Sequence, residues 1–257
     1  MLTIDLSGRV ALVVGGSRGI GAAITETLCS AGAETVFTHT GNPAYRESVE
    51  ELIRGISEKG GRVEAAAVDA RDPAATAALV NRIAKEHGRL DTLVANPGHN
   101  AAMPATEISD SQWRDGLEVN LGSAFYAVRA ALPGMLANRF GRIILIGSSA
   151  AYDGGGGAID YATAKAGLDG MMRYLARNYT RRGVVTNVVH PCVIDTALLR
   201  ERYSDEEKRT ALTAQIPVGR LGQVQDIAGL VAYLVSSWGD YICGQSILVD
   251  GGRTLFR

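Results

Sequence analysis

Strand-like and helix-like segments alternate along the whole chain, and this alternation constrains the fold more than any other feature. Short apolar runs such as Val10–Val14 and Thr92–Ala95 indicate buried strands, because strands covered on both faces carry continuous hydrophobic stretches. Longer stretches such as 74–87 follow them and indicate helices. Alternating strands and helices predict a parallel sheet with helices on both faces, the doubly wound α/β (Rossmann) fold.

No linker-like segment divides the chain, so residues 1–257 are predicted to form a single domain. The other strands are predicted at 35–38, 63–68, 142–146, 184–189 and 246–249, and the other helices at 19–31, 44–59, 109–138, 161–181 and 224–236. The long helix at 109–138 is expected to bend near Pro133-Gly134. The run Gly154–Gly157 is interpreted as a loop within the domain. The charged, less regular stretch 194–222 is expected to cover the substrate.

Composition excludes several classes of function. The formal net charge is −1 and Lys and Arg are scattered, which argues against binding to nucleic acid or to an anionic membrane. Three widely spaced Cys and four His show no metal-ligand or disulfide pattern, so no metal is expected. The N-terminus lacks a signal-peptide pattern, and no apolar run reaches the roughly 18 residues of a spanning helix. The predicted location is the cytoplasm.

A glycine-rich loop ends the first strand and opens directly into a helix: Gly15-Gly16-Ser17-Arg18-Gly19-Ile20-Gly21. Glycines there permit a tight turn and let a pyrophosphate approach a helix N-terminus. The spacing Gly-x-x-x-Gly-x-Gly differs by one residue from the usual dinucleotide fingerprint. Because a strand precedes the loop and a helix follows it, cofactor binding is favoured over a plain glycine-rich turn.

The end of the second strand bears on which nicotinamide cofactor is bound. A carboxylate there accepts a hydrogen bond from the 2′-hydroxyl of NAD and repels a 2′-phosphate. Residues 36–44 contain neither Asp nor Glu. Arg18, with Thr40 and Gly41 nearby, is available to a phosphate, although a solvated arginine is the competing interpretation. The sequence therefore favours NADP(H), with NAD(H) as the alternative.

Polar residues also follow the third and fourth strands, where a nucleotide crevice is expected at the carboxyl ends of the strands. Asp69 either hydrogen-bonds the adenine edge or starts a turn before Pro73. Asn96-Pro97-Gly98 ends the fourth strand, and an ordinary turn is the competing interpretation for Pro97.

Five further residues are candidates for the chemistry that a nucleotide site alone does not specify. Tyr161 and Lys165 lie four residues apart in a predicted helix, so their side chains share a face. A nearby ammonium lowers the pKa of a phenol from near 10, which makes a tyrosine usable as a general acid or base. Ser148 and Ser149 follow the fifth strand, where a hydroxyl can hold a substrate oxygen or simply form a turn. Asn120 interrupts a helical segment, which indicates a helix irregularity or a buried hydrogen-bonding role.

Together these pieces resemble the short-chain dehydrogenase/reductases over nearly the whole chain. The glycine loop is similar to the family's Thr-Gly-x-x-x-Gly-Ile-Gly, with Val14 in place of threonine. The run 96–98 resembles the family's Asn-Asn-Ala-Gly, with Ala95 and Pro97 as departures.

Two C-terminal segments extend the resemblance. His190–Thr196 resembles the Pro-Gly-x-x-x-Thr segment that flanks the nicotinamide, with Cys192 in place of glycine. Residues 244–252 resemble the family's C-terminal signature. The implied cofactor-binding set is Gly15, Ser17, Arg18, Gly19, Ile20, Gly21, Thr40, Asp69, Ala70, Asn96, Gly98, Tyr161, Lys165, Pro191, Ile194 and Thr196.

The resemblance implies a catalytic tetrad of Asn120, Ser148, Tyr161 and Lys165. Ser148 is preferred to Ser149 because the serine thirteen residues before the tyrosine is the usual one. In the implied mechanism Tyr161 exchanges a proton with the substrate oxygen, and Lys165 lowers the pKa of Tyr161 and binds the nicotinamide ribose. Ser148 orients the carbonyl, and Asn120 supports a proton relay through Lys165 and water.

The predicted function is NADPH-dependent reduction of a carbonyl to a secondary alcohol (EC 1.1.1.-), most similar to the 3-oxoacyl-thioester (acyl-carrier-protein) reductase branch of the family. Oxidation of a polyol, sugar or other secondary alcohol is the alternative chemistry, and a nucleotide-binding regulator without turnover is the rival class. The substrate wall is expected in 98–104, 150–157 and 194–215. By resemblance we expect a homotetramer, with the helices around Asn120 and Tyr161 in one interface.

Overall fold

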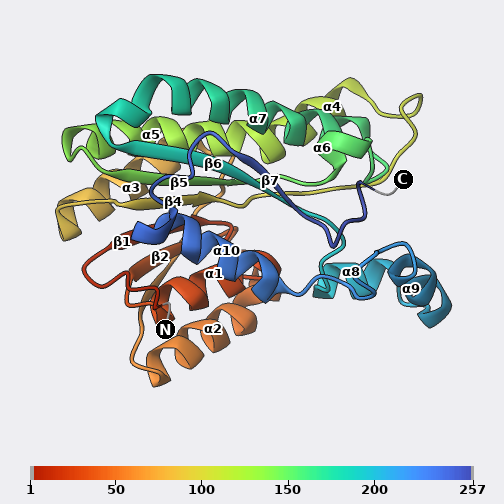
Figure 1. Ribbon diagram of the computed structural model, residues 1–257, viewed down its shortest axis with the longest axis horizontal. Coiled ribbons are helices and arrows are strands. Elements are labelled where there is room, and N and C mark those ends of the chain that lie inside the picture. Colours follow the sequence, from red (N-terminus) through yellow and green to blue (C-terminus); the bar gives the residue numbers. More distant parts are fainter. Residues whose placement is uncertain (1–2, 256–257) are drawn as a thin grey trace.

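A seven-stranded, wholly parallel sheet lies between two layers of helices in the computed structural model, which describes residues 3–255 (Figure 1). The strand order is β3-β2-β1-β4-β5-β6-β7. The prediction of a doubly wound parallel sheet is therefore confirmed. The strands are β1 Val10–Val14, β2 Glu34–His39, β3 Arg62–Ala67, β4 Thr92–Ala95, β5 Gly141–Ile146, β6 Val184–Pro191 and β7 Ser246–Val249.

Helices cover both faces of the sheet, which explains why its central strands are apolar throughout (Figure 1). In β1, Leu12 packs into the core beneath one helical layer, and its neighbour Val13 packs into the core of the opposite layer. Both side chains are fully buried. One layer consists of α1 Gly19–Ser30, α2 Arg46–Glu58 and α10 Val224–Val235, and the other of α3 Pro73–His87, α5 Ser123–Ala137 and α7 Ile159–Tyr179.

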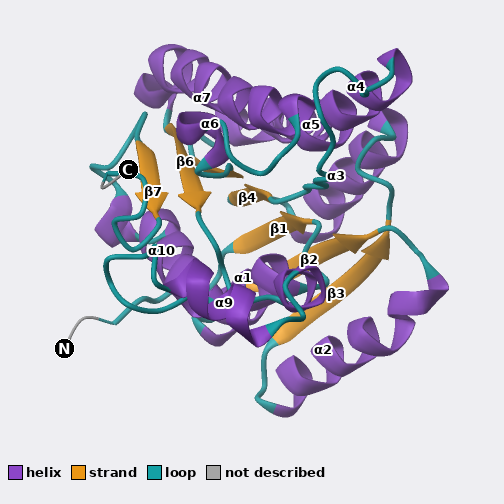
Figure 2. Cartoon of the chain, turned by 90° about the vertical axis from the view of Figure 1, so that its right-hand side faces the viewer, coloured by secondary structure: helices purple, strands orange, loops and turns teal. Residues whose placement is uncertain are grey.

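The strand order reverses between β1 and β4, because the chain builds outward from β1 in one direction and then from β4 in the other. A crevice forms at the carboxyl ends of the strands at such a point. Figure 2 looks onto this edge of the sheet. The stretch 194–222, predicted to be irregular, contains two short helices that lie beyond the strand ends, α8 Ala197–Arg202 and α9 Glu206–Thr213 (Figures 1 and 2).

The predicted helix at 109–138 is correct in extent, and it is interrupted at Asn120, where the sequence indicated an irregularity. Helix α5 continues through Pro133, and the interruption is a π-helical turn, Glu118–Gly122, between α4 Asp110–Leu117 and α5. The amide Nδ2 of Asn120 donates to the Gly116 carbonyl at 2.9 Å, so a side chain occupies an acceptor inside the helix. Displacement of a main-chain hydrogen bond in this way is a recognised cause of such bulges.

Within residues 3–255, no helix has the length and apolar character needed to cross a membrane, and no three His, Cys, Asp or Glu side chains gather as ligands for a metal.

Candidate active site

The glycine loop forms a cradle at the carboxyl end of β1 that leaves no room for side chains. Gly15 and Gly19 have φ values of +71° and +51°, in the left-handed region that favours glycine. A Cβ on Gly21 would lie 2.1 Å from the Gly15 carbonyl oxygen. The first turn of α1, residues 19–22, is uncharged, and its main-chain N–H groups face the loop. This cradle fits the pyrophosphate of a dinucleotide, since a helix N-terminus attracts anions.

Neighbouring strand ends hold the cradle in place. Asn96, after β4, donates from Nδ2 to the Gly15 carbonyl at 2.8 Å. The N–H of Gly15 donates to Thr38 Oγ1 in β2 at 2.9 Å. On the open side, a Cβ at Gly19 would lie 3.4 Å from the Thr196 methyl group. The structure therefore brings the glycine loop, Asn96 and the segment after β6 together at one edge of the sheet.

The other predicted residues of this edge have mainly structural contacts. Ile20 packs against the core below α1. Pro191 ends β6, and buried Ile194 pairs with Gly222 in a short parallel bridge. Thr196 caps α8 by accepting from the N–H of Leu199 at 3.3 Å.

Arg18 stacks on an aromatic ring that sequence reasoning did not single out. The guanidinium carbon of Arg18 lies 3.5 Å from the ring centroid of Tyr45. Tyr45 ends the short 3₁₀ helix Pro43–Tyr45 after β2, which Asn42 caps through its side chain. The guanidinium is thereby held by a ring that lies six residues after the end of β2. The only signal for Tyr45 was an aromatic residue just after a strand end that lacks acidic residues.

Asp69 forms the turn that was one of its two predicted roles. Its carbonyl accepts from Asp72 N at 2.9 Å, and its carboxylate binds the Arg71 guanidinium, with Nη2 to Oδ2 at 2.6 Å. The hydrogen bond from Arg71 lowers the pKa of Asp69. Ala70 packs against the core. A contact from Asp69 to adenine stays a prediction.

Lys165 is buried beside Tyr161, and both project from α7 toward the end of the crevice. The Lys165 side chain is almost fully buried, and its Nζ donates to the carbonyls of Pro97 at 3.1 Å and Ile146 at 2.9 Å. Nζ lies 5.8 Å from the Tyr161 ring centroid. Burial lowers the pKa of Lys165 to about 8, because desolvation disfavours the charged form. Proline at position 97 is compatible with this contact, which uses only the main-chain oxygen.

Asn120 clamps the loop after β4 next to Lys165. Its Oδ1 accepts from His99 N at 3.0 Å, and its Nδ2 donates to His99 O at 2.8 Å as well as to Gly116 O. A Cβ at Gly98 would lie 3.4 Å from Lys165 Nζ and 3.5 Å from Asn120 Oδ1. Asn120 thus combines the two features predicted for it, a helix irregularity and buried hydrogen bonding.

Ser148 lies two residues after the end of β5 and is partly accessible, whereas Ser149 is buried. The Oγ of Ser148 accepts from Ala150 N at 3.2 Å, at the start of α6 Ala150–Asp153. Its main-chain N–H points to Nδ1 of His190 in β6, at 3.0 Å. The accessible serine is therefore the one preferred from the sequence, and its hydroxyl also has the turn-forming role that was the competing interpretation.

Comparison with known proteins assigns the chain to a family. A family model described as enoyl-(acyl carrier protein) reductase matches residues 14–254. The 3-oxoacyl-(acyl-carrier-protein) reductase FabG of Escherichia coli (strain K12) is 39% identical over 249 residues, which is 97% of this chain and 98% of the relative. The reductase of the same name from Pseudomonas aeruginosa is 38% identical over the same shares of the two chains.

The chain belongs to the short-chain dehydrogenase/reductase family. The predicted family is thus confirmed, and the protein is an oxidoreductase that acts on CH–OH or carbonyl groups.

Solved structures agree with this assignment over the whole length of the short-chain dehydrogenase/reductase. A candidate NAD(P)-dependent gluconate 5-dehydrogenase from Beutenbergia cavernae, with NADP bound at low occupancy, has a TM-score of 0.91 and 34% identity and covers 99% of this chain and 100% of its own. A candidate short-chain alcohol dehydrogenase from Sinorhizobium meliloti 1021 also has a TM-score of 0.91 and 34% identity, and covers 99% of both chains.

Two predicted wall segments of this short-chain dehydrogenase/reductase meet beside the predicted tetrad residue Tyr161. Asn100 Nδ2 donates to the Gly156 carbonyl at 2.9 Å, and Met103 N donates to the Gly157 carbonyl at 2.8 Å. The loop after β4 and the glycine-rich loop after α6 are therefore joined. Both loops were predicted to form the substrate wall, but no pattern in the sequence indicates that they bond to each other.

Proposed function

We propose that this protein reduces 3-oxoacyl thioesters to 3-hydroxyacyl thioesters with NADPH. The observation that carries the proposal is the pairing of Tyr161 with buried Lys165 at the end of the dinucleotide crevice. The substrate class is supported by the curated relatives, which are named as 3-oxoacyl-(acyl-carrier-protein) reductases and match over 97% of the chain.

In this reaction NADPH, when bound, supplies a hydride to the carbonyl carbon, and the residues of the chain supply position and a proton. Tyr161 donates its phenolic proton to the carbonyl oxygen. Ser148 donates a hydrogen bond to the same oxygen, which its hydroxyl hydrogen can do because Oγ already accepts from Ala150. Two donors aimed at one oxygen stabilise the negative charge that develops there.

One N–H donor of the Lys165 ammonium group is available to bind the cofactor. An ammonium group carries three N–H donors, and the bonds to Pro97 and Ile146 occupy two of them. With a pKa of about 8, Lys165 is about nine-tenths charged at pH 7. We assign the third donor to the nicotinamide ribose and the charge to lowering the pKa of Tyr161. A proton relay through Lys165 and water, supported by Asn120, stays a prediction.

Three segments are proposed to enclose the acyl chain: 98–104, 150–157 and 194–222. The first two are hydrogen-bonded to each other. The third carries α8 and α9 beyond the strand ends, next to the Thr196 that faces the glycine loop. This arrangement supports a lid over the nicotinamide end of the crevice.

The deciding experiment measures initial rates of NADPH and NADH oxidation with a short 3-oxoacyl thioester. Turnover of this thioester, with NADPH preferred, is the expected result. A 2-enoyl thioester serves as a second substrate, because the matching family model is described by enoyl reduction. Turnover of the enoyl thioester alone would contradict carbonyl reduction.

Oxidation of a sugar acid is the second candidate, favoured by the likeness to the candidate gluconate 5-dehydrogenase. Gluconate with NADP⁺ or NAD⁺ tests it in the same assay. Turnover of gluconate without turnover of the thioester would replace the proposed substrate class. NADPH binding without turnover of either substrate would favour the regulatory protein.

Arg18 is proposed to bind the 2′-phosphate of NADPH. Arg18→Ala is therefore expected to weaken the binding of NADPH and not the binding of NADH. A hydrogen bond to a charged group contributes roughly 1.5–3 kcal/mol, which corresponds to a rise of about tenfold to a hundredfold in the KM for NADPH. The KM for NADH should stay within about twofold. Tyr45→Ala should give a smaller rise, because it removes the stacking surface and leaves the charge. Tyr45→Phe, which keeps a ring, is the matched control. Equal weakening of NADPH and NADH by Arg18→Ala would contradict this role.

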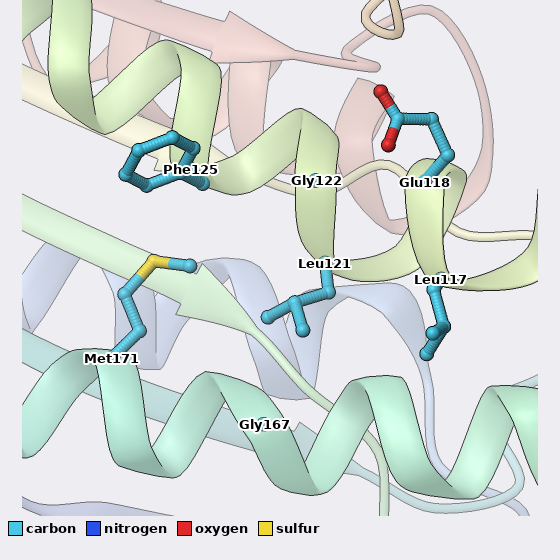
Figure 3. A pocket seen from close by; sticks show the side chains of 7 residues that line it. All are labelled: Leu117, Glu118, Leu121, Gly122, Phe125, Gly167 and Met171. Atoms are coloured by element: carbon cyan, nitrogen blue, oxygen red, sulfur yellow. The ribbon is translucent and has the colours of Figure 1, made fainter. Parts of the chain in front are cut away.

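We propose that a second copy of the chain covers an apolar groove between α7 and residues 117–125, which run from the end of α4 into α5. The groove has a volume of about 520 Å³, and Phe125, Leu121 and Met171 project into the space between the two helices (Figure 3). Gly167 brings the helices close, since a Cβ there would lie 2.9 Å from a methyl group of Leu121. The groove is lined by Leu117, Glu118, Leu121, Gly122, Phe125, Gly167 and Met171.

Exposed aromatic side chains extend the same surface. Phe125 is 46% exposed, and Tyr174, which shares the face of α7 that carries Met171, is 62% exposed. A two-fold axis beside the groove would place these side chains against the same surface of the partner, as an isologous interface requires. The homotetramer implied by the family resemblance would repeat this contact.

Phe125→Glu is therefore expected to dissociate the assembly into a smaller species, because burying an unpaired carboxylate in an apolar interface costs free energy. Size-exclusion chromatography with light scattering measures the mass of that species. Tyr241→Glu, at a fully exposed aromatic residue away from the groove, is the control and should leave the mass unchanged. A wild-type protein that elutes as a monomer would refute the interface.

A further inference from the structure

Four polar side chains form a hydrogen-bonded cluster behind Ser148, here named the His190 cluster: Tyr152, Asp169, His190 and Ser246. His190 is fully buried in β6, and Asp169 on α7 is 8% exposed. Nε2 of His190 lies 3.1 Å from Asp169 Oδ1 and 3.0 Å from Ser246 Oγ. None of these residues belongs to the proposed tetrad, yet His190 bonds to the main chain of the tetrad residue Ser148.

Hydrogen positions in the cluster follow from which atoms can donate. The Ser246 hydroxyl donates to Asp169 Oδ1 at 2.6 Å, so its oxygen is an acceptor for its other neighbours, among them the Tyr152 hydroxyl. Nε2 of His190 therefore faces two acceptors and must carry a hydrogen. The carboxylate and the serine hydroxyl thus fix the Nε2–H form of the imidazole.

The opposite nitrogen of the ring holds the main chain of Ser148. Nδ1 lies 3.0 Å from Ser148 N and 2.9 Å from Ser148 O. A neutral ring accepts from the N–H, and a charged ring donates to the carbonyl, so His190 binds this residue in either state. The N–H groups of Gly147 and Ser149, on either side of Ser148, donate to main-chain carbonyls of β6. The N–H of Ser148 between them donates to the imidazole of His190.

Close packing adds to these hydrogen bonds. A Cβ at position 147 would lie 2.3 Å from Nδ1, so the ring sits directly against the main chain at Gly147. The Tyr152 ring meets the imidazole edge-on, with centroids 5.1 Å apart. Tyr152 is 48% exposed and lies on α6, in the segment assigned to the substrate wall. The cluster therefore connects the serine to this wall.

We propose that His190, held by Asp169 and Ser246, is a positioning residue that sets the location of the Ser148 hydroxyl for carbonyl reduction. The inference rests on the proposed function, because it assigns His190 a part in that reaction through Ser148. A misplacement of about 1 Å at a reacting group can reduce the rate by roughly a hundredfold. The bond from Ser148 N to His190 opposes such a shift of Ser148 after the end of β5.

Three variants of the protein test this role. His190→Leu removes the hydrogen bonds of both ring nitrogens. It is expected to lower kcat by about tenfold or more, with the KM for NADPH unchanged. His190→Asn places an amide near the position of Nδ1, which can bond either main-chain group of Ser148, and should restore most of kcat. Thr186→Val is the matched control, since Thr186 is buried in the same strand and its hydroxyl has no hydrogen-bond partner within the described residues. It should leave kcat unchanged.

The comparison of Leu with Asn separates positioning from stability. A purely structural role would lower the melting temperature in both variants and leave kcat per folded molecule unchanged. An unchanged kcat in folded His190→Leu, or a loss of kcat in His190→Asn as large as in His190→Leu, would overturn the proposal.

A measurement without substrate keeps the inference distinct from the proposed function. NMR of protein labelled with ¹⁵N-histidine, with the His190 signal assigned by its absence in His190→Asn, should show a hydrogen on Nε2. A hydrogen on Nδ1 alone would overturn the inference. If the wild-type protein fails to reduce 3-oxoacyl thioesters, the proposed substrate class fails, and the kcat comparison is made with the substrate that does turn over.

Discussion

Replacing Tyr161 with Phe is expected to lower turnover by about a thousandfold, within the range that a single general acid contributes. The change removes one oxygen and its proton and keeps the ring that lies 5.8 Å from Lys165 Nζ. NADPH binding should therefore be retained. Initial rates and fluorescence titration with NADPH measure the two properties separately.

Tyr179→Phe, at the last residue of the same helix, is the control for the loss of a phenol from α7 and should keep full turnover. Unchanged turnover in Tyr161→Phe would refute the assignment of Tyr161 as the proton donor. A loss of NADPH binding together with turnover would instead indicate a role in holding the cofactor.

Lys165→Met is the second change with a large expected effect, on both turnover and stability. Turnover should fall by at least about a hundredfold, because the charge that makes Tyr161 a usable acid is removed.

The stability of the wild type relative to Lys165→Met should change with pH in a defined direction. Folding depresses the pKa of Lys165 from 10.5 to about 8, so between these values the unfolded chain binds a proton that the folded chain has lost. The free energy of unfolding of the wild type therefore rises over this window relative to that of the variant.

The size of the pH effect follows from the shift. The difference between about 8 and 10.5 corresponds to about 3 kcal/mol, an order-of-magnitude value. Below pH 8 both states carry the charge, and the stability difference between wild type and variant should be constant. Urea unfolding of both proteins from pH 6 to 10 measures it. The variant lacks the bonds to Pro97 and Ile146 at every pH, so the pH dependence of the difference comes from the titration of Lys165 in the wild type. A difference that stays flat up to pH 10 would contradict the depressed pKa.

Local sequence signals predicted the seven strands and the long helices to within a few residues, but not the short helices α6, α8 and α9. Valine-rich runs gave the central strands because both of their faces are covered, and the glycines at 15 and 19 marked a turn that needs positive φ. Pro133 was expected to bend the helix, and α5 continues through it. The real interruption is set by Asn120, whose hydrogen bonds to His99 depend on a loop that approaches only in the folded chain.

The sequence by itself determined the sheet, the position of the crevice and the residue types gathered there, because periodicity and spacing are properties of neighbouring residues. The tertiary structure alone decided how those residues are held. It buries Lys165 against two carbonyls from other strand ends, stacks Arg18 on Tyr45, and places His190 between Asp169 and the main chain of Ser148. These contacts join residues 19 to 68 positions apart, and no local pattern encodes such contacts; only packing of the helices on the sheet brings the partners together.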